Sequence, residues 1–208
     1  MRLPRKFYTQ PTLTVAKQVL GKYIVRVYRG RKIAGKIVET EAYIGPEDKA
    51  SHAYQGKLTP RNQAEYFIGG HIYIYLIYGM YWQLNISTSL KGKPECVLIR
   101  ALEPVIVKNH QFITPDLNKL IKINNRLVKI SELAKGPGKV CQYLKLNKSF
   151  YGEDLCTSQR IWLEDRGVKV SQGEIVSTRR IGIDYAGPYW SKRKWRFYLK
   201  NSPCVSKR

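Results

Sequence analysis

The stretch KIVETEAYIGPEDKASHAY, Lys36–Tyr54, decides the fold and brings acids, an aromatic ring and a histidine into one short segment. From Ile33 to Tyr43 the residues alternate with the period of two that is typical of a β-strand. The pattern predicts that one strand face carries Ile37, Glu39, Glu41 and Tyr43, and that the other carries Val38, Thr40 and Ala42. A carboxylate beside an aromatic ring indicates a candidate site.

A turn follows this strand, because Gly45 and Pro46 interrupt regular structure. His52 lies beyond the turn, and we expect its side chain to fold back toward Glu41. The alternative is that Glu39 and Glu41 occupy a solvated strand face, as most acidic side chains do. The spacing alone leaves both interpretations open, so the choice depends on the rest of the chain.

The length of 208 residues allows one substantial core, so we expect a single domain over residues 1–208. A hydrophobic fraction of 43% without repeats favours a globular fold over disorder. The sequence shows no secretory signal and no apolar run of membrane-spanning length. We therefore expect a cytoplasmic protein with access to the nucleoid, or a nuclear one in a eukaryote. The four cysteines are far apart, which is typical of reduced thiols rather than of a zinc site or a disulfide framework.

The charge balance indicates a polyanionic partner. The chain has 37 Lys and Arg against 15 Asp and Glu, a formal net charge of +22, and the cations are spread from Arg2 to Arg208. Neutralising phosphates with such residues releases condensed counterions, which gives strong and salt-sensitive affinity for nucleic acid. An anionic membrane surface is the weaker alternative, because no long basic amphipathic helix is visible.

Local patterns predict several further elements. We expect a helix over residues 12–20, a hairpin of strands 23–28 and 33–43, and a second hairpin of strands 72–77 and 81–87. The second hairpin places Tyr78 near its tip. An exposed aromatic ring there would serve as a wedge between bases, since exposure otherwise wastes apolar area. The alternative is that Tyr78 packs back on the sheet as part of an ordinary tyrosine stripe.

Arg100 interrupts the apolar strand predicted over residues 96–102. A buried guanidinium without a partner is costly, so the side chain either reaches water or pairs with Glu41 or Glu39. Pairing would hold a glutamate ionised.

Two later segments indicate helices. Within residues 105–135 we expect a helix from about Pro115, with its lysines on a solvated face. Gly136-Pro137-Gly138-Lys139 predicts another helix that ends near Leu144. Its free backbone amides and Lys139 would suit a phosphate, although a plain helix start fits the residues equally well.

Two basic segments are candidates for contact with a nucleic acid backbone. The loop KLTPRN, residues 57–62, offers Lys57 and Arg61 to phosphates. Residues 179–206 mix aromatic rings with cations in a pattern typical of strands that lie against nucleic acid. Strands at any basic surface would look the same.

The chain resembles the methylpurine (alkyladenine, 3-methyladenine) DNA glycosylase family in a series of ordered blocks. These are VETEAYIGPEDKASHAY, TPRN, IYIYLIYGMYWQLNIS, CVLIRALEP and GPGKVCQ. The resemblance runs from about Leu20 to Val205 and so covers nearly the whole chain. The chain departs from the family pattern at Tyr54 and Gln55 and in a longer loop from Ser87 to Glu95, which leaves the loop contacts with DNA open.

The resemblance implies catalytic and DNA-distorting roles. Glu41 matches the family's general base for the attacking water, and Arg100 matches an arginine that helps to place that water. Ile183 matches a position whose backbone carbonyl helps to hold the water. Tyr78 matches the tyrosine that inserts into the duplex where the target nucleotide has left.

The resemblance also implies a base pocket and DNA contacts. The pocket is lined by residues that match Tyr43, His52 and Tyr75, with Tyr73 close to the site. Asn85 matches an asparagine whose amide crowds the 2-amino group of guanine. The candidate contacts with the DNA backbone are Arg61 and Lys139.

The fold that the resemblance implies is α+β, a single mixed domain with a curved, mainly antiparallel β-sheet, a β-hairpin that inserts into DNA, and peripheral helices. The implied enzyme flips 3-methyladenine, 7-methylguanine, hypoxanthine or ethenoadenine out of double-stranded DNA and hydrolyses the N-glycosidic bond in base excision repair. No lysine stands directly beside Glu41 in its motif, so we expect an abasic site without strand cleavage. We expect no metal or organic cofactor, and a monomer.

Two other functions remain as alternatives. A noncatalytic RNA-binding or single-strand-binding protein would use the tyrosines as stacking platforms, but it leaves the group of Glu41, His52 and Arg100 unexplained. A carbohydrate hydrolase would use Glu39 and Glu41, but it gives the positive charge no purpose.

Overall fold

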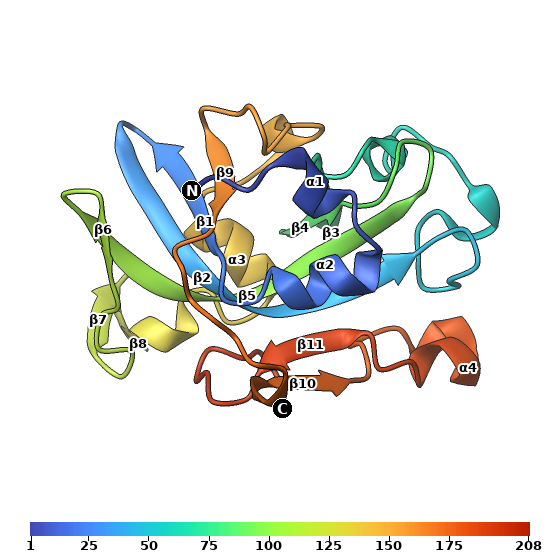
Figure 1. Ribbon diagram of the computed structural model, residues 1–208. Helices are drawn as coiled ribbons and strands as arrows, with labels where there is room; N and C mark the ends of the chain where they lie inside the picture. The colour runs from blue at the N-terminus through green and yellow to red at the C-terminus, as the bar shows by residue number, and fades with distance from the viewer.

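The computed structural model describes all residues 1–208 as a mixed α+β fold built on a curled, mainly antiparallel sheet (Figure 1). The strands of this sheet are β1 Tyr23–Tyr28, β2 Arg31–Ile44, β3 Ile72–Ile77, β4 Tyr81–Ser87, β5 Glu95–Lys108, β6 Gln111–Ile113, β9 Ile161–Glu164, β10 Ile175–Thr178 and β11 Arg196–Leu199. The strand order is β10-β11-β2-β5-β4-β3, while β1 pairs with β2 and β9, and β6 pairs with β5. The α+β class expected from the sequence is confirmed.

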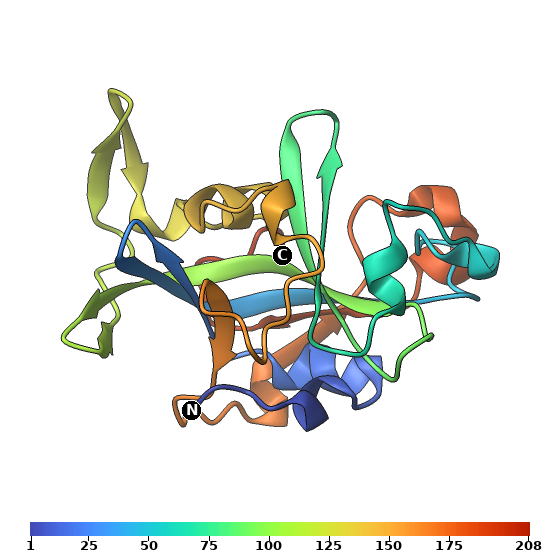
Figure 2. The same ribbon diagram turned by 90° about the horizontal axis from the view of Figure 1, so that it is seen from above.

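Helices are short and lie around the sheet. The α-helices are α1 Arg5–Tyr8, α2 Thr12–Gln18, α3 Pro137–Tyr143 and α4 Gly187–Ser191. The 3-10 turns are η1 Tyr54–Gly56, η2 Gln63–Tyr66, η3 Ile130–Glu132, η4 Lys148–Phe150, η5 Gln172–Glu174 and η6 Asp184–Ala186. Seen from above, α1 and α2 lie on one side of β2 and β5, and α3 lies on the other (Figure 2). None of the helices is long and apolar enough to cross a membrane.

The main core forms where α2 and α3 pack on the long strands β2 and β5 and on β4. It takes Val15 and Ala16 from α2, Val140 and Cys141 from α3, and aliphatic residues from the strands. The predicted helix over residues 12–20 and the helix after Gly136 are confirmed, as are the two hairpins β1–β2 and β3–β4. All four cysteines are free thiols, as expected.

A β-bulge corrects the strand faces predicted for β2. The register against β5 shifts between Ile37 and Thr40, so the alternation changes phase within the strand. Ile37 therefore faces the main core together with Ala42, whereas Val38 packs with Ala101 and Cys204 in a separate cluster. The predicted common face of Ile37 with the two glutamates is wrong, because one extra residue in a strand reverses the faces that follow it.

The helix predicted from about Pro115 is also wrong. Residues 120–129 form a separate hairpin of β7 Leu120–Ile123 and β8 Arg126–Lys129. Asn124 and Asn125 both have positive φ angles, 47° and 61°, as the two-residue turn of a tight hairpin requires. β-Branched residues flank this turn and favour the extended state. Figure 2 shows the β7–β8 hairpin projecting away from the sheet.

The C-terminal segment is only partly extended. Within residues 179–206 the strand β11 spans Arg196–Leu199, but α4 and η6 occupy residues that we expected to be strands. Strand β11 pairs with β2 across Glu39, Thr40 and Glu41, so the chain end closes over the strand that carries the acids.

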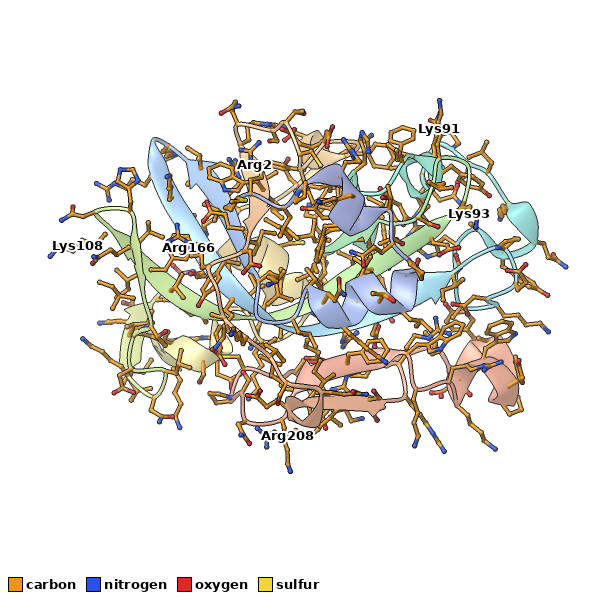
Figure 3. All side chains as sticks on the ribbon, viewed as in Figure 1. Arg2, Lys91, Lys93, Lys108, Arg166 and Arg208 are labelled. Atoms are coloured by element: carbon orange, nitrogen blue, oxygen red, sulfur yellow. The ribbon has the colours of Figure 1, made fainter.

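The cations are dispersed over the surface. Lys91, Lys108 and Arg208 point outward at widely separated parts of the outline (Figure 3).

Candidate active site

Glu41 is the centre of the candidate site. Its side chain is completely buried in β2, and three donors hold its carboxylate. The Tyr43 hydroxyl and the Arg100 guanidinium donate to Oε2 at 2.9 and 3.2 Å, and the Ile181 backbone N–H donates to Oε1 at 2.8 Å. The solvated strand face considered from the sequence is excluded.

Two of these donors keep a fixed charge state. Burial, and next the charge of Glu41, raise the pKa of Tyr43 well above its ordinary value, so its hydroxyl stays protonated and can donate. Burial lowers the pKa of Arg100, but Glu41 and Glu39 more than offset this and the net shift is upward. Arg100 is therefore a permanent cation beside Glu41.

Glu39 has a different environment from Glu41, although both are fully buried. It accepts hydrogen bonds from the Nε atoms of Arg100 and Arg196 at 3.0 and 2.7 Å. The backbone N–H and hydroxyl of Ser206 add two more, at 2.6 and 2.9 Å. These bonds tie β2 to β5, β11 and the chain end, so Glu39 supports Arg100 and joins four segments of the chain.

A second buried ion pair fixes the segment that contributes Ile181. Arg180 and Asp48 are both completely buried and paired, and Arg180 also donates to the Ala42 carbonyl at 3.0 Å. Asp48 lies in the turn after β2 that the sequence predicted. The pair therefore anchors that turn and residues 180–183 together on the strand that carries Glu41.

A cavity of about 260 Å³ lies in front of this group. Its lining is Tyr43, Ala50, His52, Arg61, Glu65, Tyr73, Tyr75, Ile77, Tyr78, Gln83, Asn85, Cys96, Leu98, Arg100, Ile181, Gly182, Ile183 and Tyr185. Glu41 lies directly behind the wall, since its three partners Tyr43, Arg100 and Ile181 all belong to the lining. The volume is slightly below the roughly 300–1,000 Å³ of drug-sized sites, which suits one small planar ring.

The aromatic side chains of the lining contact one another. The rings of His52 and Tyr75 lie edge to face with centroids 4.7 Å apart, and His52 Nδ1 is 2.6 Å from the Tyr73 hydroxyl. Burial, and then the nearby charges of Arg61 and Lys57, lower the pKa of His52 to about 4. His52 is therefore a neutral part of the wall at neutral pH, and its hydrogen bond is to Tyr73 instead of Glu41.

Of the two alternatives for Tyr78, the structure shows the exposed one. It is 82% exposed at the tip of the β3–β4 hairpin, which excludes packing back on the sheet. Its φ angle is 53° and that of Gly79 is 68°, so both tip residues are left-handed. Such a conformation is uncommon for a tyrosine and costs roughly 1–2 kcal/mol, and here it directs an aromatic side chain away from the body.

Asn85 and Ile183 both line the cavity. Asn85 is buried on β4, with its Oδ1 3.8 Å from Cys96 Sγ. Ile183 packs in a small apolar cluster with Ala50 and Ala186. In the segment of Ile183, the residue that contacts the Glu41 carboxylate is Ile181, through its backbone N–H. Sequence reasoning missed this contact because a backbone N–H leaves no signature in residue type.

The two cations proposed for phosphates already have partners within the chain. Arg61 donates to the Leu76 carbonyl at 3.3 Å and lies 5.0 Å from the centroid of the Tyr75 ring. Lys139 pairs with Glu132 at 3.4 Å, with its side chain about half exposed. Arg61 also lines the cavity, and the contact of either cation with DNA stays a prediction.

The TPRN motif has a structural role that the sequence did not reveal. Asn62 is buried and accepts from the Thr59 backbone N–H at 2.7 Å. Its amide donates to the carbonyls of His52 and Lys57 at 3.1 and 2.8 Å. One asparagine thus joins the His52 loop to the start of η2, which carries Glu65 into the cavity. Glu65 was also missed, because a lone acid in a loop looks like a surface residue.

No group of three metal-ligating side chains is present.

Comparison with known proteins identifies the family of this chain. A family model described as Methylpurine-DNA glycosylase matches residues 6–203. A protein named "Putative 3-methyladenine DNA glycosylase" from Methanocella arvoryzae is 46% identical over 206 residues, which cover 99% of this chain and 96% of that protein. The human protein named "DNA-3-methyladenine glycosylase" is 41% identical over 207 residues, which cover 99% of this chain and 68% of that protein.

Proposed function

This chain belongs to the methylpurine-DNA glycosylase family, and on that premise we propose that it is a monofunctional DNA glycosylase for alkylated purines. It hydrolyses the N-glycosidic bond of a damaged nucleotide in double-stranded DNA and leaves an abasic site for base excision repair. Its substrates are 3-methyladenine, 7-methylguanine, hypoxanthine and ethenoadenine. Residues 1–208 act as a single domain and as a monomer.

The observation that carries this proposal is the environment of Glu41. Each carboxylate oxygen can accept about two hydrogen bonds, and Oε1 accepts only from Ile181, so one acceptor direction remains for a water. Arg100 and Tyr43 hold the other oxygen and leave Glu41 no freedom to turn. An ionised carboxylate in this position deprotonates water and stabilises the oxocarbenium-like sugar as the base departs.

The cavity requires the base to leave the duplex, because a stacked nucleotide cannot reach a buried carboxylate. Extrusion costs a few kcal/mol, and less for a damaged base. The exposed ring of Tyr78 at the β3–β4 tip fills the gap that the nucleotide leaves. The extruded purine lies between Tyr43, His52 and Tyr75, where a cationic ring is attracted to aromatic faces.

Two residues of the lining adjust which bases are accepted and how water is held. Asn85 occupies the floor beside Cys96, where its amide opposes the 2-amino group of guanine. Ile183 contributes its backbone carbonyl to the water, next to the Ile181 contact with Glu41. The lining contains arginines but no lysine, which supports hydrolysis without strand cleavage.

The test is base release by Glu41→Gln. Wild-type protein is incubated in excess with duplex DNA that contains hypoxanthine or 7-methylguanine, and the free base and the abasic site are measured. General base catalysis contributes about 10²–10⁴-fold, so we expect a loss of that size while lesion binding persists. Glu47→Gln removes an equal charge from an exposed position and should keep full activity.

Full activity of Glu41→Gln would remove this residue from the mechanism. Release of no base by the wild-type protein, together with binding to single strands or RNA, would favour the noncatalytic binding protein. The carbohydrate hydrolase is disfavoured, because Glu39 is fully buried, is held by Arg100, Arg196 and Ser206, and does not line the cavity.

A further inference from the structure

One polar atom of the cavity has no partner. Glu65 is buried on η2 and lines the cavity, and its Oε2 makes no hydrogen bond. Its Oε1 has a single weak donor, the Cys96 thiol at 3.6 Å. Buried polar groups in folded proteins are nearly always hydrogen-bonded, because an unpaired one loses its water without compensation. The Glu65 carboxyl therefore has an acceptor oxygen that no group of the chain occupies.

We propose that Glu65 is a specificity-determining residue that contacts the extruded base and favours purines made cationic by alkylation over neutral ones. The inference rests on the proposed function and adds the charge class that the cavity selects. A purine nucleotide alkylated at N3 or N7 carries a positive charge and has a planar base, so it brings a cation to the unpartnered oxygen. The neutral lesion hypoxanthine brings hydrogen-bonding groups but no charge.

The surroundings of Glu65 make this contact strong. Burial raises the pKa of its carboxyl to about 8; the Cys96 hydrogen bond opposes this shift, and Asp48 adds to it. No Lys or Arg forms an ion pair with Glu65. An acid kept neutral by burial ionises when a cation arrives, and in a site of low dielectric that attraction exceeds its value in water.

The backbone around Glu65 is fixed, which gives the contact its selectivity. Asn62 binds the Thr59 turn before η2, and the Ala64 N–H donates to the Tyr151 hydroxyl at 2.9 Å. Cys96 lies between the Glu65 Oε1 and Asn85 Oδ1, at 3.6 and 3.8 Å. Glu65 and Asn85 thus face the same part of the cavity, where the ring edge of a base would be read.

The contact acts on binding more than on bond cleavage. A cationic base becomes neutral as it leaves, so an anion beside it stabilises the bound state before the transition state. The experiment therefore measures affinity. The probes are duplexes with 7-methylguanine or hypoxanthine on 2′-fluorinated sugars, in which the fluorine slows loss of the base by disfavouring the oxocarbenium ion.

Glu65→Gln is the informative variant, because glutamine keeps the shape and the hydrogen bonding but cannot become an anion. We expect its affinity for the 7-methylguanine duplex to fall about tenfold or more, while affinity for the hypoxanthine duplex changes less than about threefold. Glu65→Met should weaken both. Glu47→Gln removes the same charge outside the cavity and should leave both unchanged.

Equal effects of Glu65→Gln on both duplexes, with the wild-type protein releasing both bases from ordinary substrates, would overturn this inference alone. A wild-type protein that releases neither base would overturn the proposed function and this inference with it. A thermal melt of each variant shows whether a loss of binding comes from a loss of folding.

Discussion

Three buried glutamates show how much the surroundings of a residue matter. Glu39 accepts four hydrogen bonds, from Arg100, Arg196 and Ser206. Glu41 is held by three donors and keeps one acceptor direction free. Glu65 has an oxygen with no donor at all. The same side chain is in turn a structural clamp, a candidate base and a candidate ligand for a cation.

At the same scale, His52 predicts a pH dependence of stability. Its folded pKa of about 4 lies below the ordinary value of 6.5. Between these values the unfolded chain binds more protons, so the free energy of unfolding falls as the pH is lowered from 6.5 toward 4. The full shift of the His52 pKa corresponds to a change of roughly 3 kcal/mol in the free energy of unfolding. Urea denaturation across this range should therefore show a weaker pH dependence in His52→Gln than in wild type.

The comparison with wild type isolates His52 from other groups. Glu65 has the opposite effect on the pH dependence of stability, because its raised pKa makes the folded chain bind more protons between about pH 4.5 and pH 8. His110 is exposed, so His110→Gln is the matched control and should follow the wild-type curve. An unchanged slope in His52→Gln would mean that burial does not keep this imidazole neutral.

At the scale of elements, α3 supports the β3–β4 hairpin. Gly138 in the first turn of α3 packs against the Tyr81 ring, and an added Cβ would lie 3.1 Å from that ring. Tyr81 begins β4 and pairs with Ile77, next to the tip that carries Tyr78. The glycine in the GPGK block is thus explained by close packing, and a phosphate contact at this helix start stays a prediction.

Gly138→Ala should therefore displace the hairpin. Overpacking costs about 1–3 kcal/mol, and the same strain should move Tyr78 and lower the single-turnover rate of base release several-fold. Gly173→Ala is the control, because its added Cβ would meet nothing within 4 Å and its φ is ordinary. A normal rate in a destabilised Gly138→Ala protein would show that the tip position does not depend on α3.

At the scale of the whole molecule, the two free hairpins project on the same side. Figure 2 shows β3–β4 and β7–β8 rising from the side of the sheet that faces away from α1 and α2. The β7–β8 hairpin and the residue before it carry four exposed cations without ion pairs, which are Lys119, Lys122, Arg126 and Lys129. A duplex lying over Tyr78 would bring its backbone toward this hairpin.

A salt titration tests this arrangement. Replacing both Lys122 and Arg126 by Gln should weaken binding to damaged and undamaged duplexes alike and reduce the slope of log affinity against log salt by about 2. The rate of base release at saturating protein should not change. Lys6 and Lys17 are exposed on α1 and α2, so the same double change there is the control. Equal slopes for the two double variants would place the duplex elsewhere.

The sequence by itself determined the elements that depend on near neighbours. Strand periodicity and the turn residues predicted β1, β3 and β4 with their ends, and Tyr78-Gly79 at a tip. The cost of an unpaired guanidinium left Arg100 either to reach water or to pair with Glu41 or Glu39, and it pairs with both glutamates. Alternation, turn chemistry and charge pairing each depend on residue types that the sequence states directly.

Only the tertiary structure decided the rest. The bulge at Val38 follows from the register against β5, and the Ile181 contact and the unpaired oxygen of Glu65 follow from segments far apart in the chain. The β7–β8 hairpin stands where we expected a helix. Asn124 and Asn125 adopt the positive φ angles of a tight turn, and this turn prevails over the helical spacing of the apolar residues. Burial and hydrogen bonding are set by which distant groups arrive, and a local pattern does not contain that information.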